Sequence, residues 1–97
     1  MGPGIGSADD DALARIQALL AARAAHCYPP AAARLGLTGT SQVHFCVRDG
    51  AAAQISIARG SGEAMLDRAA AECVVGEAGP LPAVERCLDV PVRFVAR

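Results

Sequence analysis

The stretch HCYPPAAARLGLTGT, His26–Thr40, decides how the rest of the chain is read. Pro30 suits the first turn of a helix, because the N–H that proline lacks would be unpaired there anyway. Gly36 suits the end of the same helix, since glycine readily takes the left-handed conformation common after a last turn. The stretch therefore predicts a helix of about two turns that leads into the following segment.

The apolar period changes to two directly after this helix. Residues 41–47, SQVHFCV, alternate in the manner of a half-buried strand. Asp49-Gly50 is a strong hairpin signal, and AQISIA, residues 53–58, reads as the return strand. The two faces of the first strand are Val43, Phe45 and Val47, and Gln42, His44 and Cys46.

Upstream of the opening stretch, residues 8–25 predict an N-terminal helix. Leu13, Ile16 and Leu20 recur at helical spacing, and aspartates at its start favour the helix dipole. Residues 1–7, MGPGIGS, resemble a linker or tag-cleavage remnant and are left out of the fold. Residues 26–97 are expected to form the remaining domain.

Downstream, residues 63–75 predict a helix that ends at Gly76, and residues 87–97 predict a last strand. One helical layer on one sheet buries all these stripes. We therefore expect an α+β fold with two or three helices on one face of a three-stranded antiparallel sheet. The stripes are Leu66, Ala69, Ala70 and Cys73 on the helix, and Leu88, Val90, Val92 and Phe94 on the strand.

Composition excludes several classes of function. The 97 residues carry a net charge of −1 with no basic run, so a nucleic-acid surface is not expected. No apolar run is long enough to span a membrane. Asp49 fits a turn and Asp67 fits a helix surface, and no serine lies in a nucleophile-elbow motif. We expect no enzymatic activity and no cofactor.

The four cysteines, Cys27, Cys46, Cys73 and Cys87, form no C-x-x-C pair, and His26-Cys27 has no recognised metal spacing. No metal is expected. An even number in a small domain favours disulfides and an oxidising compartment, although four reduced, buried cysteines are the alternative. Strand and helix positions favour Cys46–Cys87 with Cys27–Cys73. Cys46–Cys73 stays open, because a strand can also be linked to the helix packed on it.

From Tyr28 onward the sequence resembles the C-terminal domain of the TonB family. The matching pieces come in order: YPPAAARLGLTGT, then VHFCVRDG, then ISIARGSGEAMLDRAAAECV, then PLP followed by VPVRF. The resemblance covers roughly 70 residues. Four features depart from the family pattern, namely the Gly60-Ser61-Gly62 turn, Ser41 at a position where valine is common, the four cysteines, and the loop from Gly76 to Arg86.

The resemblance implies binding. Family members are periplasmic and carry an inner-membrane anchor before this domain, through which a proton-channel complex acts. The domain captures an extended segment of an outer-membrane transporter, the TonB box, by adding it as a strand to its own last strand. This implies that His26 and Tyr28 lie near the box. Together with the last strand, the candidate partner-binding residues are Asp89, Val90, Val92, Arg93, Phe94, Val95, Arg97, His26 and Tyr28.

Pro91 gives the last strand a physical reason to be an edge. Because proline has no N–H, its side of the strand is best left without a ladder partner. Asp89, Arg93 and Val95 share that side, so their backbone groups stay available for an incoming strand. Proline and charge on an edge also protect against aggregation, and the local sequence alone leaves that alternative open. The resemblance favours peptide capture.

Two other functions remain as alternatives. A TolA-like domain that maintains the envelope belongs to the same structural class. A structural or assembly module of a secretion or motility machine belongs to another. A free last strand also allows a homodimer through that edge.

Overall fold

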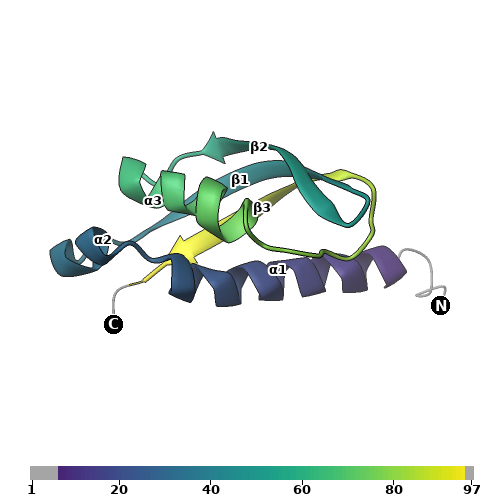
Figure 1. Ribbon diagram of the computed structural model, residues 1–97, viewed down its shortest axis with the longest axis horizontal. Coiled ribbons are helices and arrows are strands. Elements are labelled where there is room, and N and C mark those ends of the chain that lie inside the picture. The colour runs from purple at the N-terminus through teal and green to yellow at the C-terminus, as the bar shows by residue number, and fades with distance from the viewer. Residues whose placement is uncertain (1–6, 96–97) are drawn as a thin grey trace.

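The structure is a computed structural model that describes the backbone of residues 7–95 and the side chains of residues 10–95. Three strands form one antiparallel sheet in the order β2–β1–β3, with helices packed on one of its faces (Figure 1). The predicted α+β class is therefore confirmed. Residues 1–6 of the predicted linker remnant, and Arg97, lie outside the described residues.

Two helices precede the sheet. Helix α1 spans Ser7–Cys27 and buries Ile16 and Leu20 completely. Helix α2 spans Pro30–Leu35, so proline occupies its first turn as predicted. Gly36 follows at φ +66°, and the Leu37 N–H donates to the Ala32 carbonyl at 3.0 Å. The left-handed glycine ends α2 and directs the chain into β1.

Strand β1 (Gly39–Arg48) is central, between β2 (Ala51–Arg59) and β3 (Cys87–Phe94). Asp49 and Gly50 have φ values of +52° and +76°, which is the backbone of a tight two-residue hairpin turn. Strand β2 then contains a bulge, because Cys46 pairs with Ala53 while His44 pairs with Ser56. Gln54 takes φ +53° within this bulge.

The helix predicted over residues 63–75 divides into α3 (Ala64–Arg68) and a π-helical segment, η1 (Ala69–Val75). Its wider turn is visible in the Gly76 N–H, which donates to the Ala71 carbonyl five residues back at 2.9 Å. Val74 and Val75, although adjacent, are both buried. The π-helical turns therefore place two consecutive side chains in the core.

Arg23 of α1 donates hydrogen bonds to backbone carbonyl groups near the end of η1. Its guanidinium donates to the Cys73 carbonyl at 2.9 Å and to the Val74 carbonyl at 3.2 Å. A cation at this position also interacts favourably with the C-terminal end of the helix dipole. The contact joins α1 to η1 beside the Cys27–Cys73 disulfide.

Two disulfides link elements that are distant in sequence. Cys27–Cys73 joins the end of α1 to η1 and spans 46 residues. Cys46–Cys87 joins β1 to β3 and spans 41 residues. The structure thus has the two pairs favoured by strand and helix positions, and not Cys46–Cys73. Loops of this length correspond to roughly 3–4 kcal/mol of stability each in the chain-entropy model.

Candidate functional site

The candidate site begins with β3, which lies at one edge of the sheet. Among the strands the structure describes, β3 pairs with β1 alone. Its other edge therefore presents backbone N–H and C=O groups that no strand of this sheet uses. Such an edge can accept a further strand.

The backbone direction along β3 follows from one hydrogen bond at its start. The Val47 N–H donates to the Arg86 carbonyl at 2.8 Å, so the backbone groups of residue 86 face β1. Backbone direction alternates along a strand and the β1–β3 register is continuous, so residues 88, 90, 92 and 94 face β1 as well. Residues 89, 91 and 93 face the open edge.

Pro91 falls on the open side in this register. It lies opposite Gln42 in a pair whose backbone groups point away from each other. The proline therefore removes no ladder hydrogen bond between β1 and β3. The first donor on the open side after Pro91 is the Arg93 N–H.

The side chains of β3 separate cleanly by face. Leu88, Val90, Val92 and Phe94 are buried against the helices, in an unbroken alternation with exposed neighbours. Of the candidate partner-binding residues, Val90, Val92 and Phe94 thus have buried side chains. Asp89, Arg93 and Val95 are exposed, and Arg97 lies outside the described residues.

A groove lies where the end of β3 meets the end of α1. It has a volume of about 480 Å³ and opens to solvent. Five of the candidate residues contribute to it, from three separate segments. The lining residues are Ala21, Ala24, Ala25, His26, Tyr28, Ala33, Arg93, Phe94 and Val95.

Tyr28 and Phe94 give the groove a fixed aromatic wall. Their rings stack with centroids 6.0 Å apart and an interplanar angle of 25°. The Tyr28 hydroxyl donates to the Leu37 carbonyl, which holds the ring against the turn that leads into β1. Because Phe94 is the last residue of β3, this wall stands at the end of the open edge.

The groove combines an apolar lining with basic groups. Its basic lining residues are His26 and Arg93, and none of the described residues that line it is an aspartate or glutamate. Val95 is 48% exposed and adds an accessible apolar side chain to the lining. A ligand with an apolar side chain and a nearby carboxylate fits this combination of groups.

Sequence reasoning did not identify the alanines that form the groove. Ala21, Ala24 and Ala25 on α1 and Ala33 on α2 carry side chains too small to fill the space beside Phe94. The signal was present as two alanine-rich runs on either side of the tyrosine. It read only as helix propensity, since periodicity does not show which runs meet in space.

Asp67 lies on α3 and is partly buried, and it has hydrogen-bond partners that the sequence did not indicate. Its carboxylate accepts a hydrogen bond from the Ser41 hydroxyl at 2.6 Å and from the Ser61 N–H at 2.8 Å. Burial acts to raise the pKa of Asp67, but the hydrogen bonds from Ser41 and Ser61 lower it more, and the net pKa lies below its usual 3.8. These contacts fasten α3 to β1 and to the turn before α3.

The fold defines a class: small α+β domains with helices on one face of a three-stranded antiparallel sheet. Within this class, the chain belongs to the family described as Gram-negative bacterial TonB protein C-terminal, whose profile matches residues 24–96. The family consists of non-enzymatic energy transducers whose C-terminal domains are periplasmic and whose partners in general are outer-membrane transporters.

A solved relative has the same fold. The solution structure of the Helicobacter pylori TonB C-terminal domain is 26% identical in sequence, with a TM-score of 0.63. The match covers 86% of this chain and 91% of that one. No curated protein matches the chain.

Among the residues that the structure describes, no helix combines the length and apolar character needed to cross a membrane.

Proposed function

We propose that this domain captures an extended segment of an outer-membrane transporter, the TonB box, by strand addition to β3. The captured segment is the joint through which an inner-membrane proton-channel complex drives uptake. That complex acts through a membrane anchor that precedes the domain in the full-length protein. The observation that carries the proposal is the open edge of β3 next to the groove at its end.

Backbone geometry supports strand addition at this edge. Residues 89 and 93 direct their backbone groups outward, and Pro91 leaves a gap of one donor between them. Each main-chain hydrogen bond to the incoming strand adds about 0.5–1.5 kcal/mol. A few such bonds give a moderate affinity, which suits a joint that forms and releases repeatedly.

The groove supports a specific position for the partner's end. A strand running along β3 reaches the groove beside Phe94 and Val95. There one apolar side chain of the partner can rest against Tyr28. His26 and Arg93 then meet a carboxylate of the same segment, which favours partners with an acidic residue at that end.

Amide signals in a peptide titration test the proposal directly. We expect a box peptide to shift the backbone amides of Arg93 and Val95 and to slow their hydrogen exchange, because they gain partners. The amides of Val90 and Val92 already face β1 and keep their exchange rates. An undisturbed Arg93 amide at saturating peptide would show that this edge is not the site.

N-methylated peptides separate strand addition from side-chain docking. In the peptide, methyl groups on alternate backbone nitrogens block donors on one edge only. We expect one of the two alternating sets to abolish binding and the other to leave it nearly unchanged. Equal tolerance of both sets would favour docking through side chains and would contradict strand addition.

A proline variant of Arg93 and its alanine control test whether the contact is on β3. Arg93→Pro removes an outward donor, and we expect about threefold to tenfold weaker binding, the equivalent of one hydrogen bond. Arg93→Ala is the control for the lost side chain, and the difference between the two reports the N–H. Circular dichroism should show both variants folded, because the altered N–H has no partner in the sheet.

A further inference from the structure

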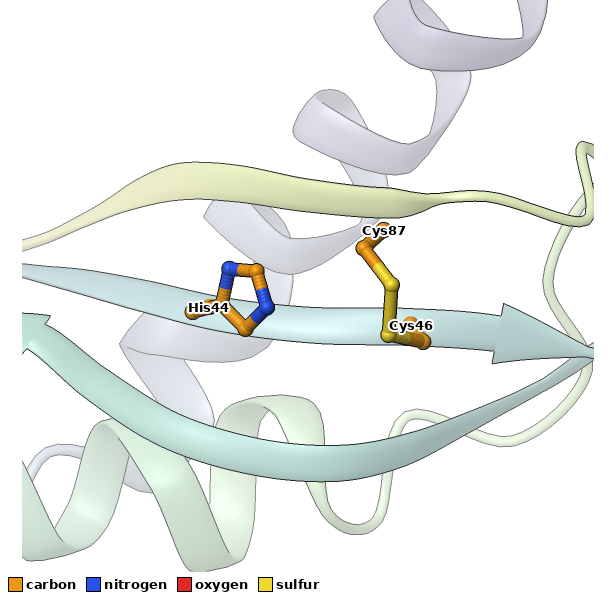
Figure 2. Close-up of side chains that lie close together, drawn as sticks. All are labelled: His44, Cys46 and Cys87. Carbon is orange, nitrogen blue, oxygen red and sulfur yellow. A yellow bond between two sulfur atoms is a disulfide. The ribbon is translucent and has the colours of Figure 1, made fainter.

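The face of the sheet opposite the helices carries a compact group of side chains of the types that can bind a metal. His44 and Cys46 of β1 lie opposite Asp89 and Cys87 of β3, in two successive cross-strand pairs on the same face. Figure 2 shows the imidazole beside the Cys46–Cys87 disulfide, with the helices behind the sheet. The ligand atoms of His44, Cys46 and Cys87 all lie within 4.8 Å of one another.

The three side chains are close enough together to bind one zinc ion in tetrahedral geometry once the disulfide is broken. With Zn–S bonds of about 2.3 Å, two thiolates on one ion lie roughly 3.8 Å apart. Both cysteines project from adjacent strands, so small side-chain rotations bring their sulfurs to that distance. Two thiolates and an imidazole are also the donor types that zinc prefers.

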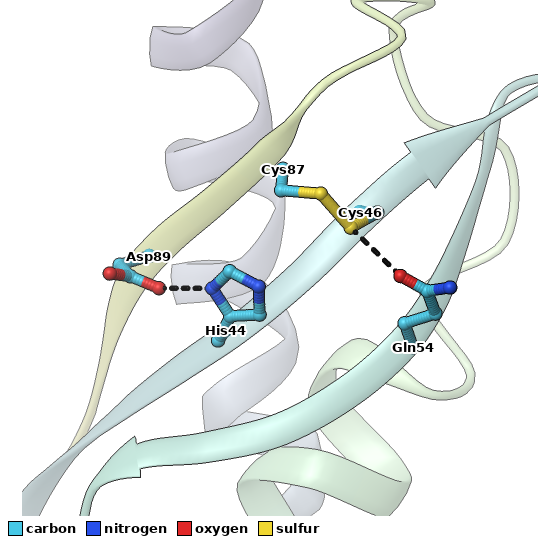
Figure 3. Close-up of polar contacts among 5 residues, drawn as sticks. All are labelled: His44, Cys46, Gln54, Cys87 and Asp89. Atoms are coloured by element: carbon cyan, nitrogen blue, oxygen red, sulfur yellow. Dashed lines mark hydrogen bonds and ion pairs between the residues drawn. A yellow bond between two sulfur atoms is a disulfide. The ribbon is translucent and has the colours of Figure 1, made fainter.

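Asp89 gives His44 the orientation that metal ligands usually have. The His44 Nδ1 lies 2.6 Å from the Asp89 carboxylate oxygen. An ionised carboxylate only accepts hydrogen bonds, so the proton of the neutral ring is on Nδ1 and the Nε2 lone pair is free. Figure 3 shows Asp89 and the disulfide on opposite sides of the ring. A carboxylate that holds the far nitrogen is the common second partner of a metal-bound histidine.

We propose that reduction of Cys46–Cys87 converts this cluster into a zinc-binding site with His44, Cys46 and Cys87 as ligands and Asp89 as the positioning residue. The fourth position is open to water. The Gln54 side-chain oxygen lies 3.4 Å from the Cys46 sulfur on the side away from His44 (Figure 3).

The chemistry balances with a dithiol as the reductant. The dithiol gives two electrons and two protons to the Cys46–Cys87 bond, which breaks into two thiols while the dithiol closes to its own disulfide. Zn²⁺ then forms two bonds to sulfur and displaces the two thiol protons into solvent. Cys87 is exposed at the surface, so an attacking thiolate can reach this disulfide.

The site would preserve a connection between β1 and β3. In the oxidised protein the disulfide joins Cys46 to Cys87 directly. In the reduced protein the ion would join the same two residues through coordinate bonds. The edge strand thus stays fastened to the centre of the sheet in either redox state.

Cobalt spectroscopy of the reduced protein tests the proposal. We use Co²⁺ as the probe, with a phosphine reductant that does not compete as a thiol, and a Cys27→Ala/Cys73→Ala background to remove the other sulfurs. We expect one Co²⁺ per chain, with thiolate charge-transfer and tetrahedral d–d bands, and competition by Zn²⁺. The oxidised protein should show neither band.

Matched variants assign the ligands. Asp89→Asn should weaken Co²⁺ binding about tenfold to 100-fold, and His44→Gln should weaken it at least as much. His26 is the other histidine of the chain, and the His26→Gln variant should bind Co²⁺ as tightly as the parent does. Zn²⁺ binding should also release close to two protons near neutral pH, measured by calorimetry in buffers of different ionisation enthalpy.

The comparison remains decisive if the background variant does not fold. The wild-type chain with both disulfides reduced should then show the same difference between His44→Gln and His26→Gln. If the two histidine variants bind alike in both backgrounds, the cysteines act as an unstructured chelator and the proposal is overturned. Absence of Co²⁺ binding after complete reduction would overturn it equally.

Discussion

Ser41 is the polar exception on the inward face of β1. It is fully buried between apolar neighbours, and its hydroxyl is satisfied by Asp67 of α3. A buried hydroxyl without a partner costs about 1–3 kcal/mol, so serine at this position depends on the carboxylate. The sequence showed an unusual serine in a strand, but its partner lies 26 residues away on another element.

Stability should therefore depend on pH through Asp67. The pKa of Asp67 is lowered in the folded state, so its contribution is complete well above the usual value of 3.8 and is lost as pH falls through the folded value. We expect Asp67→Asn to flatten the acidic part of the curve, since asparagine keeps an acceptor but does not titrate. Urea unfolding at several pH values measures it.

Substitution by alanine separates the hydrogen bonds from the charge. Asp67→Ala should destabilise the domain by about 1–3 kcal/mol at neutral pH, because Ser41 and the Ser61 N–H lose their acceptor. Adding Ser41→Val should recover part of that loss, as the methyl groups bury well in the core. A double variant that is merely the sum of the two single ones would contradict the coupling.

At the scale of elements, alternation made β3 the most predictable part of the fold. Its four inward residues and the outward Pro91 follow from a period of two alone. The bulge at Gln54 was not predictable, because a non-glycine residue with positive φ leaves no mark in the hydrophobic pattern. The π-helical segment η1 was not predicted either, because the hydrophobic pattern does not distinguish its wider turns from those of an α-helix.

The hairpin between β1 and β2 should depend on glycine at one position. Gly50 has φ +76°, and an added Cβ would lie 3.4 Å from the Leu81 carbonyl. We expect Gly50→Ala to lower the free energy of unfolding by about 1–2 kcal/mol, the cost of a left-handed alanine. Asp49→Asn is the control and should change it by less than about 0.5 kcal/mol, because asparagine suits this turn. Chemical denaturation of both variants gives the comparison.

For the whole molecule, the open edge of β3 that suits a partner strand suits a second copy of the chain equally well. Pro91 interrupts the row of outward donors and limits such pairing. We expect Pro91→Ala to strengthen self-association several-fold in sedimentation experiments, while Arg93→Pro keeps the protein monomeric at the same concentration. A box peptide should dissociate the Pro91→Ala dimer. Persistence of the dimer at saturating peptide would place its interface elsewhere.

The two disulfides also set how far the molecule can lengthen under load. Cys27–Cys73 and Cys46–Cys87 interleave along the sequence, so neither enclosed segment can be drawn out independently of the other. Through Cys27–Cys73, the covalent route from α1 to β3 is 46 residues shorter than the chain itself. At about 3.4 Å per extended residue, the disulfide prevents roughly 150 Å of extension. A domain linked in this way extends little under a pulling force. Force applied at one end is therefore transmitted to the other end, because little of the displacement is lost to unfolding of the chain.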